Sequence, residues 1–434
     1  MNEYDSLIMA SILKAKGYSV TSTPDDADVM IINTCSVREK PEHKVFSAAG
    51  RLKKYREKNR GKLIIAGCTA QQIGEGFIKK LPYVDAVVGP HFTQQIDKIL
   101  DEIEEKGRVV KTGFLKNPVE RFRVKFSPPL IEGVSAYITI MEGCDNFCTY
   151  CIVPYVRGRE ISRPHQEIIE DVKNLVQMGI KDFTLLGQNV NSYGKKGDEE
   201  WDFARLVREV ASISGVLRLR FITSHPKDMT DEVIRLFGEF ENIVPYLHLP
   251  LQSGSNRILK LMNRKYTIEQ YLETVWKLRE VRPEIALTTD LIVGFPGETE
   301  SDFEDTLKAV EKIRYDNFFS FKYSPRPFTK AASLPDRVPS EVAQRRLEIL
   351  QELQRKITLE KNMEKVGTVQ EVLVERVSKK NPDEMMGRTP CNRIVNFPGD
   401  RSMIGQIIKV RITEAYQNSL KGEAIREGIK SGSI

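Results

Sequence analysis

The stretch Gly143-Cys144-Asp145-Asn146-Phe147-Cys148-Thr149-Tyr150-Cys151 decides how the rest of the chain is interpreted. It places Cys144, Cys148 and Cys151 in the pattern Cys-x3-Cys-x2-Cys, directly after an apolar run that predicts a strand over residues 136–141. Three thiolates with this spacing can hold three corners of a 4Fe-4S cube and leave the fourth iron open to an external ligand. The stretch therefore predicts an iron–sulfur site at the start of a large domain.

A zinc site is the main alternative for the same cysteines. Structural zinc takes four ligands in a tetrahedral arrangement, so a residue such as His165 would have to complete the site. Three free thiols that lie together by chance are the remaining interpretation. The spacing, and the position directly after a strand, favour the cluster.

Alternating strand and helix patterns continue on the carboxyl side of this stretch. The helix candidates include residues 166–177, 203–211, 267–281 and 300–311. The strand candidates are residues 136–141, 182–186, 217–223, 244–249, 286–293 and 317–322. Six β/α units predict a partial barrel whose chemistry lies on the loops at the carboxyl ends of its strands.

A smaller alternation precedes the cysteine stretch. A helix to Lys16, a strand over 28–33, a helix over 39–58 and a strand over 63–66 predict an α/β domain with a parallel sheet. Cys35 and Cys68 come just after the two strands. Because open α/β sheets bind ligands at the carboxyl ends of their strands, we expect these cysteines to share one site.

The carboxyl-terminal part changes character twice. A long charged stretch after Pro339 predicts a solvent-exposed linking helix. From Val366 onward, short β-branched segments at 369–374, 393–396 and 406–412, separated by Gly and Pro, predict a small antiparallel barrel. The expected division is an N-terminal α/β domain (1–106), a linker (107–129), a partial barrel (130–338), a linking helix (339–365) and a small barrel (366–430).

Composition sets limits on function. The 434 residues contain 66 Lys and Arg against 60 Asp and Glu, a net charge of +6 that permits a polyanionic partner. No apolar run is long enough to span a membrane, and Met1 does not open a signal peptide. We therefore expect a cytoplasmic protein whose six cysteines are thiols or ligands rather than disulfides.

Several motifs together resemble one family, the MiaB-type tRNA methylthiotransferases of the radical S-adenosylmethionine superfamily. The resemblance covers essentially the whole chain and is carried by residues 33–40 (Asn-Thr-Cys-Ser-Val-Arg-Glu-Lys), the Gly67-Cys68 pair, residues 143–151 with 154–160 and 162–164, residues 247–255 (Leu-His-Leu-Pro-Leu-Gln-Ser-Gly-Ser), and residues 387–389 with Asn392-Arg393.

The resemblance implies an enzyme of three parts. These are an amino-terminal methylthiotransferase domain with a second 4Fe-4S cluster, a radical domain that binds S-adenosylmethionine, and a TRAM domain that binds RNA. The implied reaction puts a methylthio group on C2 of an isopentenylated adenosine beside the anticodon of tRNA. A flavodoxin- or ferredoxin-type electron donor and a sulfur donor are the implied partners, and we expect a monomer.

Further site residues are predicted around this core. Tyr150, Gln188, Asn189, Asp290, Gly294 and Gly297 are expected at the S-adenosylmethionine site, although a satisfied turn also explains Gln188 and Asn189. Lys379, Lys380, Arg388 and Arg393 are expected to contact RNA phosphates. Arg157, Arg159 and Arg163 are candidates for the cofactor carboxylate or an RNA phosphate, with surface solvation as the alternative.

One departure from the family pattern concerns the second cluster. The family supplies three cysteines to it, the first in a Cys-Gln-Met-Asn segment, whereas this chain begins Met1-Asn2-Glu3-Tyr4 and leaves Cys35 and Cys68. Our hypothesis is that the start was placed at an internal methionine. If Met1 is the true start, we expect radical cleavage of S-adenosylmethionine without efficient methylthiolation.

Two rival functions remain open from the sequence. A sister methylthiotransferase would act on threonylcarbamoyladenosine in tRNA or on an aspartate of a ribosomal protein. A noncatalytic RNA-binding protein would use the same cysteines for structural zinc.

Overall fold

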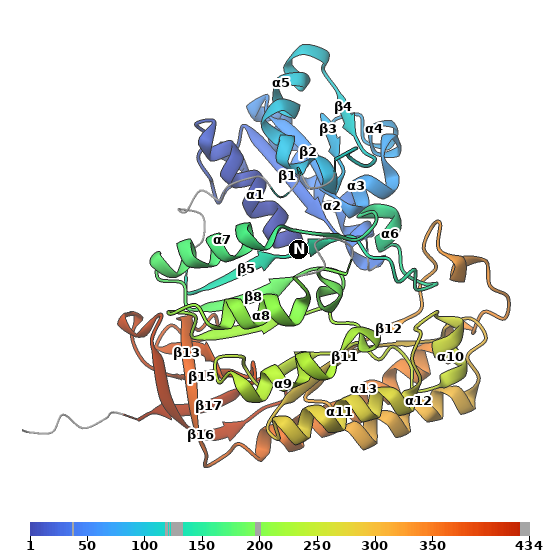
Figure 1. Cartoon of the computed structure of the whole chain (residues 1–434). Coiled ribbons are helices and arrows are strands. Elements are labelled where there is room, and N and C mark those ends of the chain that lie inside the picture. The colour runs from blue at the N-terminus through green and yellow to red at the C-terminus, as the bar shows by residue number, and fades with distance from the viewer. Residues whose placement is uncertain (37–38, 118–119, 121, 123–132, 196–200, 426–434) are drawn as a thin grey trace, which may run out of the picture.

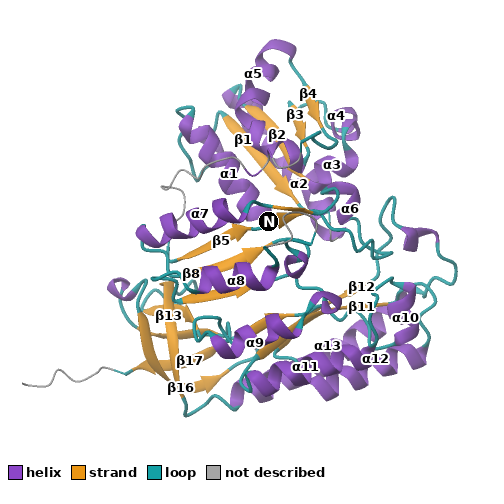
Figure 2. Cartoon of the chain, viewed as in Figure 1, coloured by secondary structure: helices purple, strands orange, loops and turns teal. Residues whose placement is uncertain are grey.

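The computed structural model describes residues 1–434 apart from 37–38, 118–119, 121, 123–132, 196–200 and 426–434. Three units follow one another along the chain: a parallel α/β unit, a larger series of β/α repeats, and a small closed β-barrel (Figure 1). Figure 2 shows helices on the outside of the repeats and strands within. This arrangement confirms the predicted fold class.

The first sheet is parallel, with strand order β1-β2-β3-β4. Its strands are β1 Val29–Thr34, β2 Lys62–Gly67, β3 Ala86–Val88 and β4 Val109–Lys111. Its helices are α1 Asn2–Ala15, α2 Glu39–Asn59, α3 Cys68–Ile73, α4 Glu75–Lys80 and α5 Ile96–Lys106. Successive β2 residues face opposite sides, so Ile64 packs with α1 and α5 whereas Leu63 packs with α2 and α4.

The β4 strand corrects the predicted linker over residues 107–129. Val109–Lys111 pairs with β3 and completes the first sheet, so the first unit extends at least to Lys111. Three residues are too few to show a periodic pattern in the sequence, and for that reason the strand was missed. The later part of the predicted linker, including 123–129, lies outside the described residues.

The β/α repeats form two parallel three-stranded sheets joined by a bridge between Leu219 and Ile243. The strands are β5 Ser135–Thr139, β8 Asp182–Leu186, β9 Arg218–Phe221, β10 Tyr246–His248, β11 Ala286–Val293 and β12 Asn317–Lys322. The helices are α7 His165–Gln177, α8 Phe203–Ala211, α9 Asp231–Glu239, α10 Asn256–Leu261, α11 Ile268–Val281 and α12 Glu300–Ile313. A short ribbon (β6 Met141–Glu142, β7 Ile161–Ser162) and α6 Val153–Val156 follow β5.

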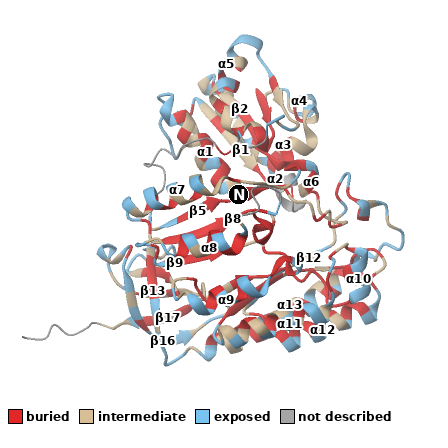
Figure 3. Cartoon of the chain, viewed as in Figure 1, coloured by how far each residue is buried: buried red, intermediate tan, exposed pale blue. Residues whose placement is uncertain are grey.

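Alternation along the strands separates an apolar layer from a polar interior. Leu219 and Phe221 join the main core beneath the helices, whereas Arg218 and Arg220, which alternate with them along β9, are buried but outside that core. Figure 3 shows that burial concentrates along these strands. The interior of the partial barrel therefore carries buried polar side chains.

The linking helix is less exposed than predicted. Helix α13, Ser340–Met363, buries Ala343, Leu350 and Ile357 along one stripe that packs against β12 and α12. Its Arg346 is also buried and pairs with Glu298 at 2.8 Å. The charged composition concealed a stripe spaced at three to four residues, which is the spacing of one helix face.

The last unit is a closed barrel with strand order β13-β14-β15-β17-β16. Its strands are β13 Val369–Val377, β14 Glu384–Arg388, β15 Ile394–Pro398, β16 Ile407–Ala415 and β17 Leu420–Ala424. The pairing is antiparallel as predicted, except that β15 and β17 run parallel. That parallel pair closes the barrel.

The small barrel is fastened to the β/α repeats by hydrogen bonds from basic side chains. Arg218 Nη1 donates to the carbonyl of Arg388 at 2.7 Å, and its Nη2 donates to the carbonyl of Glu371 at 3.3 Å. Lys181, whose carbonyl accepts from Arg218 N, donates from its Nζ to the carbonyl of Gly405 at 2.9 Å. Within the described part of the chain, no helix has the length and apolarity needed to cross a membrane.

Candidate functional site

Residues 143–151, the cysteine loop, leave the barrel directly after β5 and β6. Gly143 opens the loop with φ +76, and a Cβ atom there would lie 2.0 Å from the carbonyl oxygen of Arg159. The backbone N–H of Gly143 donates to Gln188 Oε1 at 2.6 Å. Glycine is therefore required at the point where the loop turns away from the strand.

A second segment holds the loop from the other side. Asn263 Nδ2 donates to the carbonyl oxygens of Asn146 and Phe147, both at 3.1 Å. Thr149 donates from its backbone N–H to Met262 O at 3.0 Å. These bonds fix the loop between the barrel strands and the end of α10.

A buried arginine lies against one of the three thiols. Arg264 Nη1 donates to Cys148 Sγ at 3.4 Å, and Nη2 donates to the carbonyl of Pro250 at 2.8 Å. Its Nε donates to the Tyr266 hydroxyl at 2.9 Å. The guanidinium can offset negative charge on a thiolate or a bound cluster. Sequence reasoning missed Arg264, and its only signal was a basic residue between the apolar run before it and Tyr266.

Burial disfavours ionisation of two thiols in the cysteine loop. It raises the pKa of Cys144 to about 11 and raises the pKa of Cys151, with neighbouring Cys148 adding to both shifts. Because metal ligation requires thiolates, cluster binding must release these protons.

Cys35 and Cys68 lie together as predicted from the strand ends. The register pairs Thr34 with Gly67, so each cysteine follows one of two adjacent paired residues. Arg157 Nε donates to Cys68 Sγ at 3.4 Å. The same guanidinium pairs with Glu142 at 2.9 Å and Asp5 at 2.5 Å.

The three arginines after the cysteine loop have separate positions. Arg157 is buried in the network just described, so it is not a surface residue. Arg163 is also buried and pairs with Glu167 at 3.3 Å and Asp171 at 2.8 Å. Arg159 is exposed and pairs with Asp145 at 2.6 Å.

The predicted cofactor residues divide into those bonded within the protein and those with a free polar atom. Gln188 holds Gly143, and Gly294 donates to Glu298 Oε2 at 2.7 Å while packing closely against Ala343 of α13. Gly297 donates to Asp336 O at 2.8 Å. These bonds account for the three residues without a ligand, and their cofactor role stays a prediction.

Asp290, Tyr150 and Asn189 face different surroundings. Asp290 lies 3.4 Å from His248 Nε2, and Tyr150 packs beside the apolar cluster around Met262 and Phe295. Asn189 donates to Asp228 Oδ2 at 2.8 Å, which leaves its Oδ1 atom for another partner.

Three buried polar atoms at the carboxyl ends of β8 and β9 lack a partner within the described protein: Asn189 Oδ1, Ser224 Oγ and His225 Nε2. Burial, with nearby Arg264 contributing, lowers the pKa of His225, so the ring is neutral. Buried polar atoms normally have partners. Their placement at the carboxyl strand ends fits a polar ligand such as S-adenosylmethionine beside the cysteine loop.

Of the four residues predicted to contact RNA, the two lysines are exposed, whereas the two arginines are bonded within the protein. Lys379 and Lys380 are exposed in the turn between β13 and β14. Arg388 bonds to Asn392 Oδ1 at 3.2 Å and to Glu375 at 3.2 Å. Arg393 donates to Asn362 at 3.1 Å and to Asp316.

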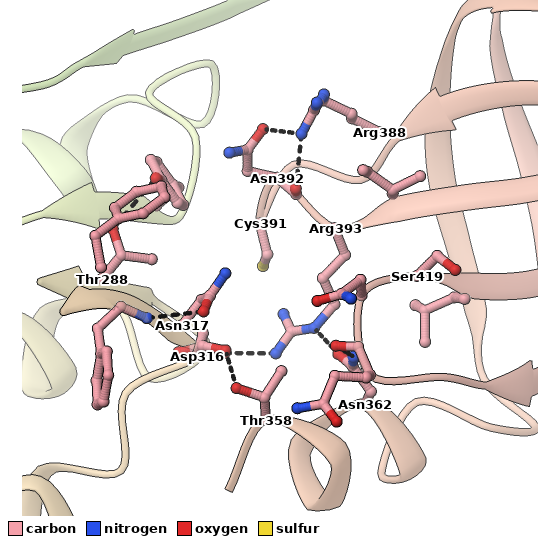
Figure 4. Close-up of a pocket in the computed structure, with 17 residues that line it drawn as sticks. Thr288, Asp316, Asn317, Thr358, Asn362, Arg388, Cys391, Asn392, Arg393 and Ser419 are labelled. Atoms are coloured by element: carbon pink, nitrogen blue, oxygen red, sulfur yellow. Dashed lines mark hydrogen bonds and ion pairs between the residues drawn. The ribbon is translucent and has the colours of Figure 1, made fainter. Parts of the chain in front are cut away.

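Both arginines line a cavity of about 350 Å³ between the small barrel and the β/α repeats. Figure 4 shows Arg393 directed across this cavity toward Asp316 and Asn362. Both charges are paired within the protein. The partners of Arg388 lie in the small barrel itself. Those of Arg393 come from α13 and from the segment before β12, so the sequence could not reveal them.

A mononuclear zinc site finds no support in the geometry. Among the residues that the structure describes, no three His, Cys, Asp or Glu side chains converge as a single metal ion requires. His165, the candidate fourth ligand, stacks on Trp201 with ring centroids 3.6 Å apart. A cube binds each thiolate through a different iron and does not need such convergence.

Three family models match three separate parts of the chain. Residues 138–310 match the Radical SAM superfamily, residues 1–89 match the uncharacterized protein family UPF0004, and residues 364–425 match the TRAM domain. An enzyme from Acidovorax sp. (strain JS42), tRNA-2-methylthio-N(6)-dimethylallyladenosine synthase, is 49% identical over 98% of this chain and 95% of its own length. The enzyme of the same name from Geobacter metallireducens is 49% identical over 98% of this chain and 96% of its own length.

The chain belongs to the MiaB-type methylthiotransferase family. As a radical S-adenosylmethionine enzyme, this MiaB-type protein uses a 4Fe-4S cluster and S-adenosylmethionine.

Solved structures support the fold of the MiaB-type chain. The methyltransferase TsrM from Kitasatospora setae, with cobalamin and a [4Fe-4S] cluster bound, has a TM-score of 0.58 at 15% identity and covers 76% of this chain and 74% of its own. The radical enzyme OxsB has a TM-score of 0.53 at 12% identity, covering 81% of this chain and 53% of its own. At these identities the similarity concerns the fold alone.

Proposed function

We propose that this chain is a tRNA-2-methylthio-N6-dimethylallyladenosine synthase, which adds a methylthio group to C2 of N6-isopentenyladenosine next to the anticodon of tRNA. One observation carries the proposal: the cysteine loop and the Cys35–Cys68 pair occur in one chain and are linked through Arg157, which follows the loop and contacts Cys68. The named relatives support the same substrate.

The cysteine loop would hold the catalytic cluster through Cys144, Cys148 and Cys151. When bound there, a 4Fe-4S cluster supplies one-electron cleavage of S-adenosylmethionine, which side chains cannot supply at neutral pH. Gly143, Gln188 and Asn263 position the loop. Arg264 offsets negative charge beside Cys148.

Binding of S-adenosylmethionine would use the polar groups at the barrel mouth. Asn189 Oδ1, Ser224 Oγ and His225 Nε2 offer buried hydrogen-bonding atoms. Because His225 is neutral and its Nδ1 accepts from Lys227 N at 3.3 Å, its Nε2 can donate a hydrogen bond without adding charge near the sulfonium. The surrounding apolar core excludes water from this region.

We further propose that Cys35 and Cys68 supply ligands to an auxiliary 4Fe-4S cluster. Support comes from their adjacent strand ends and from the Arg157 cation, which can offset thiolate charge. Asp5 and Glu142 in turn hold that cation in place.

The proposed partners follow from the chemistry. The substrate tRNA would meet Lys379 and Lys380, whose side chains are exposed. A flavodoxin- or ferredoxin-type protein would deliver electrons, and a separate donor would supply sulfur. We propose that the enzyme acts in the cytoplasm as a monomer.

Mass spectrometry of tRNA nucleosides from cells with and without this gene tests the proposal. We expect 2-methylthio-N6-isopentenyladenosine to disappear without the gene and to return with the intact gene, but not with Cys148→Ala. A change confined to threonylcarbamoyladenosine would instead assign the sister activity. Unchanged nucleosides would refute both.

A further inference from the structure

A strongly exposed aromatic side chain lies on the loop that follows β12. Phe328 has 67% of its surface exposed. Its ring centroid lies 6.1 Å from the ring centroid of Tyr155, an exposed residue of α6. Figure 1 shows this loop, in orange, projecting from the β/α repeats on the side of α6 and α10. The two rings form an exposed aromatic pair.

The backbone at Phe328 is one that glycine prefers. Arg326 O accepts from Thr329 N at 3.3 Å, Pro327 stands at the second turn position, and Phe328 has φ +69. This is the pattern of a type II turn, whose third position favours glycine. A phenylalanine there is strained and gains little burial, so folding does not account for its presence.

The aromatic pair is continuous with the cysteine loop. Tyr155 lies four residues after Cys151, and its backbone N–H bonds to Ile152 O at 2.9 Å. On the other side, Ala331 N, three residues after Phe328, donates to Thr149 O at 2.8 Å. Both rings are thus carried by segments attached to the loop that would hold the catalytic cluster.

The surroundings of the pair are basic. Lys330, two residues after Phe328, is exposed. The segment from Lys322 to Arg337 contains four basic residues, of which Arg326 is buried, and one acidic residue. Exposed aromatic faces among cations suit unpaired nucleotides, because bases stack and phosphates are attracted.

We propose that Phe328 and Tyr155 form a stacking platform for an unpaired RNA base next to the target adenosine. This inference rests on the proposed function and adds a recognition site to it. The platform would hold a neighbouring base at the barrel rim and so help to keep the target nucleotide turned toward the cysteine loop.

The glycine preference at position 328 gives an unusually clean test. Phe328→Gly removes the ring and relieves the turn, so the thermal midpoint should stay equal or rise while RNA binding weakens. Phe328→Trp keeps a stacking face. Trp276→Ala removes another exposed aromatic, on α11, and serves as the matched control.

Binding of an isopentenylated anticodon stem-loop to the reconstituted full chain is the primary measurement. We expect Phe328→Gly to weaken binding roughly tenfold, Phe328→Trp to bind like the parent, and Trp276→Ala to show no change. Replacing the flanking bases one at a time by abasic sites should identify one position whose loss weakens the parent but not Phe328→Gly.

Equal RNA binding by the parent and Phe328→Gly would overturn the platform, and so would an additive effect at every abasic site. Product formation by the parent, measured by nucleoside mass spectrometry in the same preparations, keeps the two questions apart. If the parent forms the product and Phe328→Gly binds normally, only the platform fails. If the parent forms neither the product nor 5′-deoxyadenosine, the proposed function fails.

Discussion

Arg157 donates a hydrogen bond to the sulfur of Cys68 across 3.4 Å, although 89 positions separate the two residues. The same guanidinium is held by Asp5 from the first helix and Glu142 from the ribbon after β5. One buried cation therefore connects the N-terminal unit, its cysteine pair and the segment that leads into the cysteine loop.

Removing this cation should destabilise the protein strongly. Arg157→Met removes this cation from the buried carboxylates of Asp5 and Glu142, and breaking a buried pair costs about 3–5 kcal/mol. Denaturant unfolding of the iron-free protein measures the change. Arg159→Met is the control, because its exposed pair with Asp145 should contribute about 1 kcal/mol or less. Similar losses in the two variants would contradict the structural role of Arg157.

We expect Arg264 to raise the reduction potential of the catalytic cluster. The reduced cluster carries one more negative charge than the oxidised cluster, so the buried cation beside Cys148 favours reduction. Arg264→Gln keeps an N–H donor but removes the charge, and we expect a more negative reduction potential in an EPR-monitored titration. Arg264→Lys, which keeps the charge, should stay closer to the parent. An unchanged potential in Arg264→Gln would exclude this electrostatic effect.

Gly143 tests the geometry of the cysteine loop. Alanine there would place its Cβ 2.0 Å from the Arg159 carbonyl, in addition to the strain of the positive φ. Gly179 also has a positive φ, but a Cβ atom added there would meet nothing within 4 Å, so Gly179→Ala isolates the backbone cost of about 1–3 kcal/mol. We expect Gly143→Ala to lose more stability and to incorporate less iron. Full iron content in Gly143→Ala would show that the loop tolerates the displacement.

His225 predicts a loss of stability in acid. Burial lowers its pKa from 6.5 in the folded state, so below about pH 6.5 the unfolded chain binds a proton that the folded chain does not. The free energy of unfolding should therefore fall by about 1.4 kcal/mol per pH unit below this value on account of His225. His225→Asn, which can still accept from Lys227 N, should reduce the slope between pH 7 and 5. The same slope in both proteins would assign the acid sensitivity to other groups.

The sequence predicted elements well where residue patterns are long. The bounds of β8, β11 and β12 match the predicted strands, because each is a sustained apolar or alternating run. The three-residue β4 strand carried no such pattern. The many charged residues of α13 made the whole helix look solvent-exposed in the sequence, so its buried stripe was not predicted.

Sequence patterns grouped the cysteines by their spacing and by their positions after strands, but contacts made across the fold left no local pattern. The cysteine loop and the Cys35–Cys68 pair were found from spacing and strand ends. Arg264 lies 116 positions from Cys148, and Arg393 meets Asp316 from a different unit, so local pattern gave no indication of either contact. Phe328 had no signal in the sequence, because its positive φ, its exposure and its contact with Tyr155 are visible only in the structure.

The attachment of the small barrel through Arg218 and Lys181 has a consequence for how RNA is selected. Because these bonds hold the two units together, we expect Lys379 and Lys380 to keep a limited range of distances from the cysteine loop. An RNA that contacts both these lysines and the cysteine loop must span the distance between them. We therefore expect the enzyme to select its target nucleotide by the distance along the RNA from the phosphates that the lysines bind.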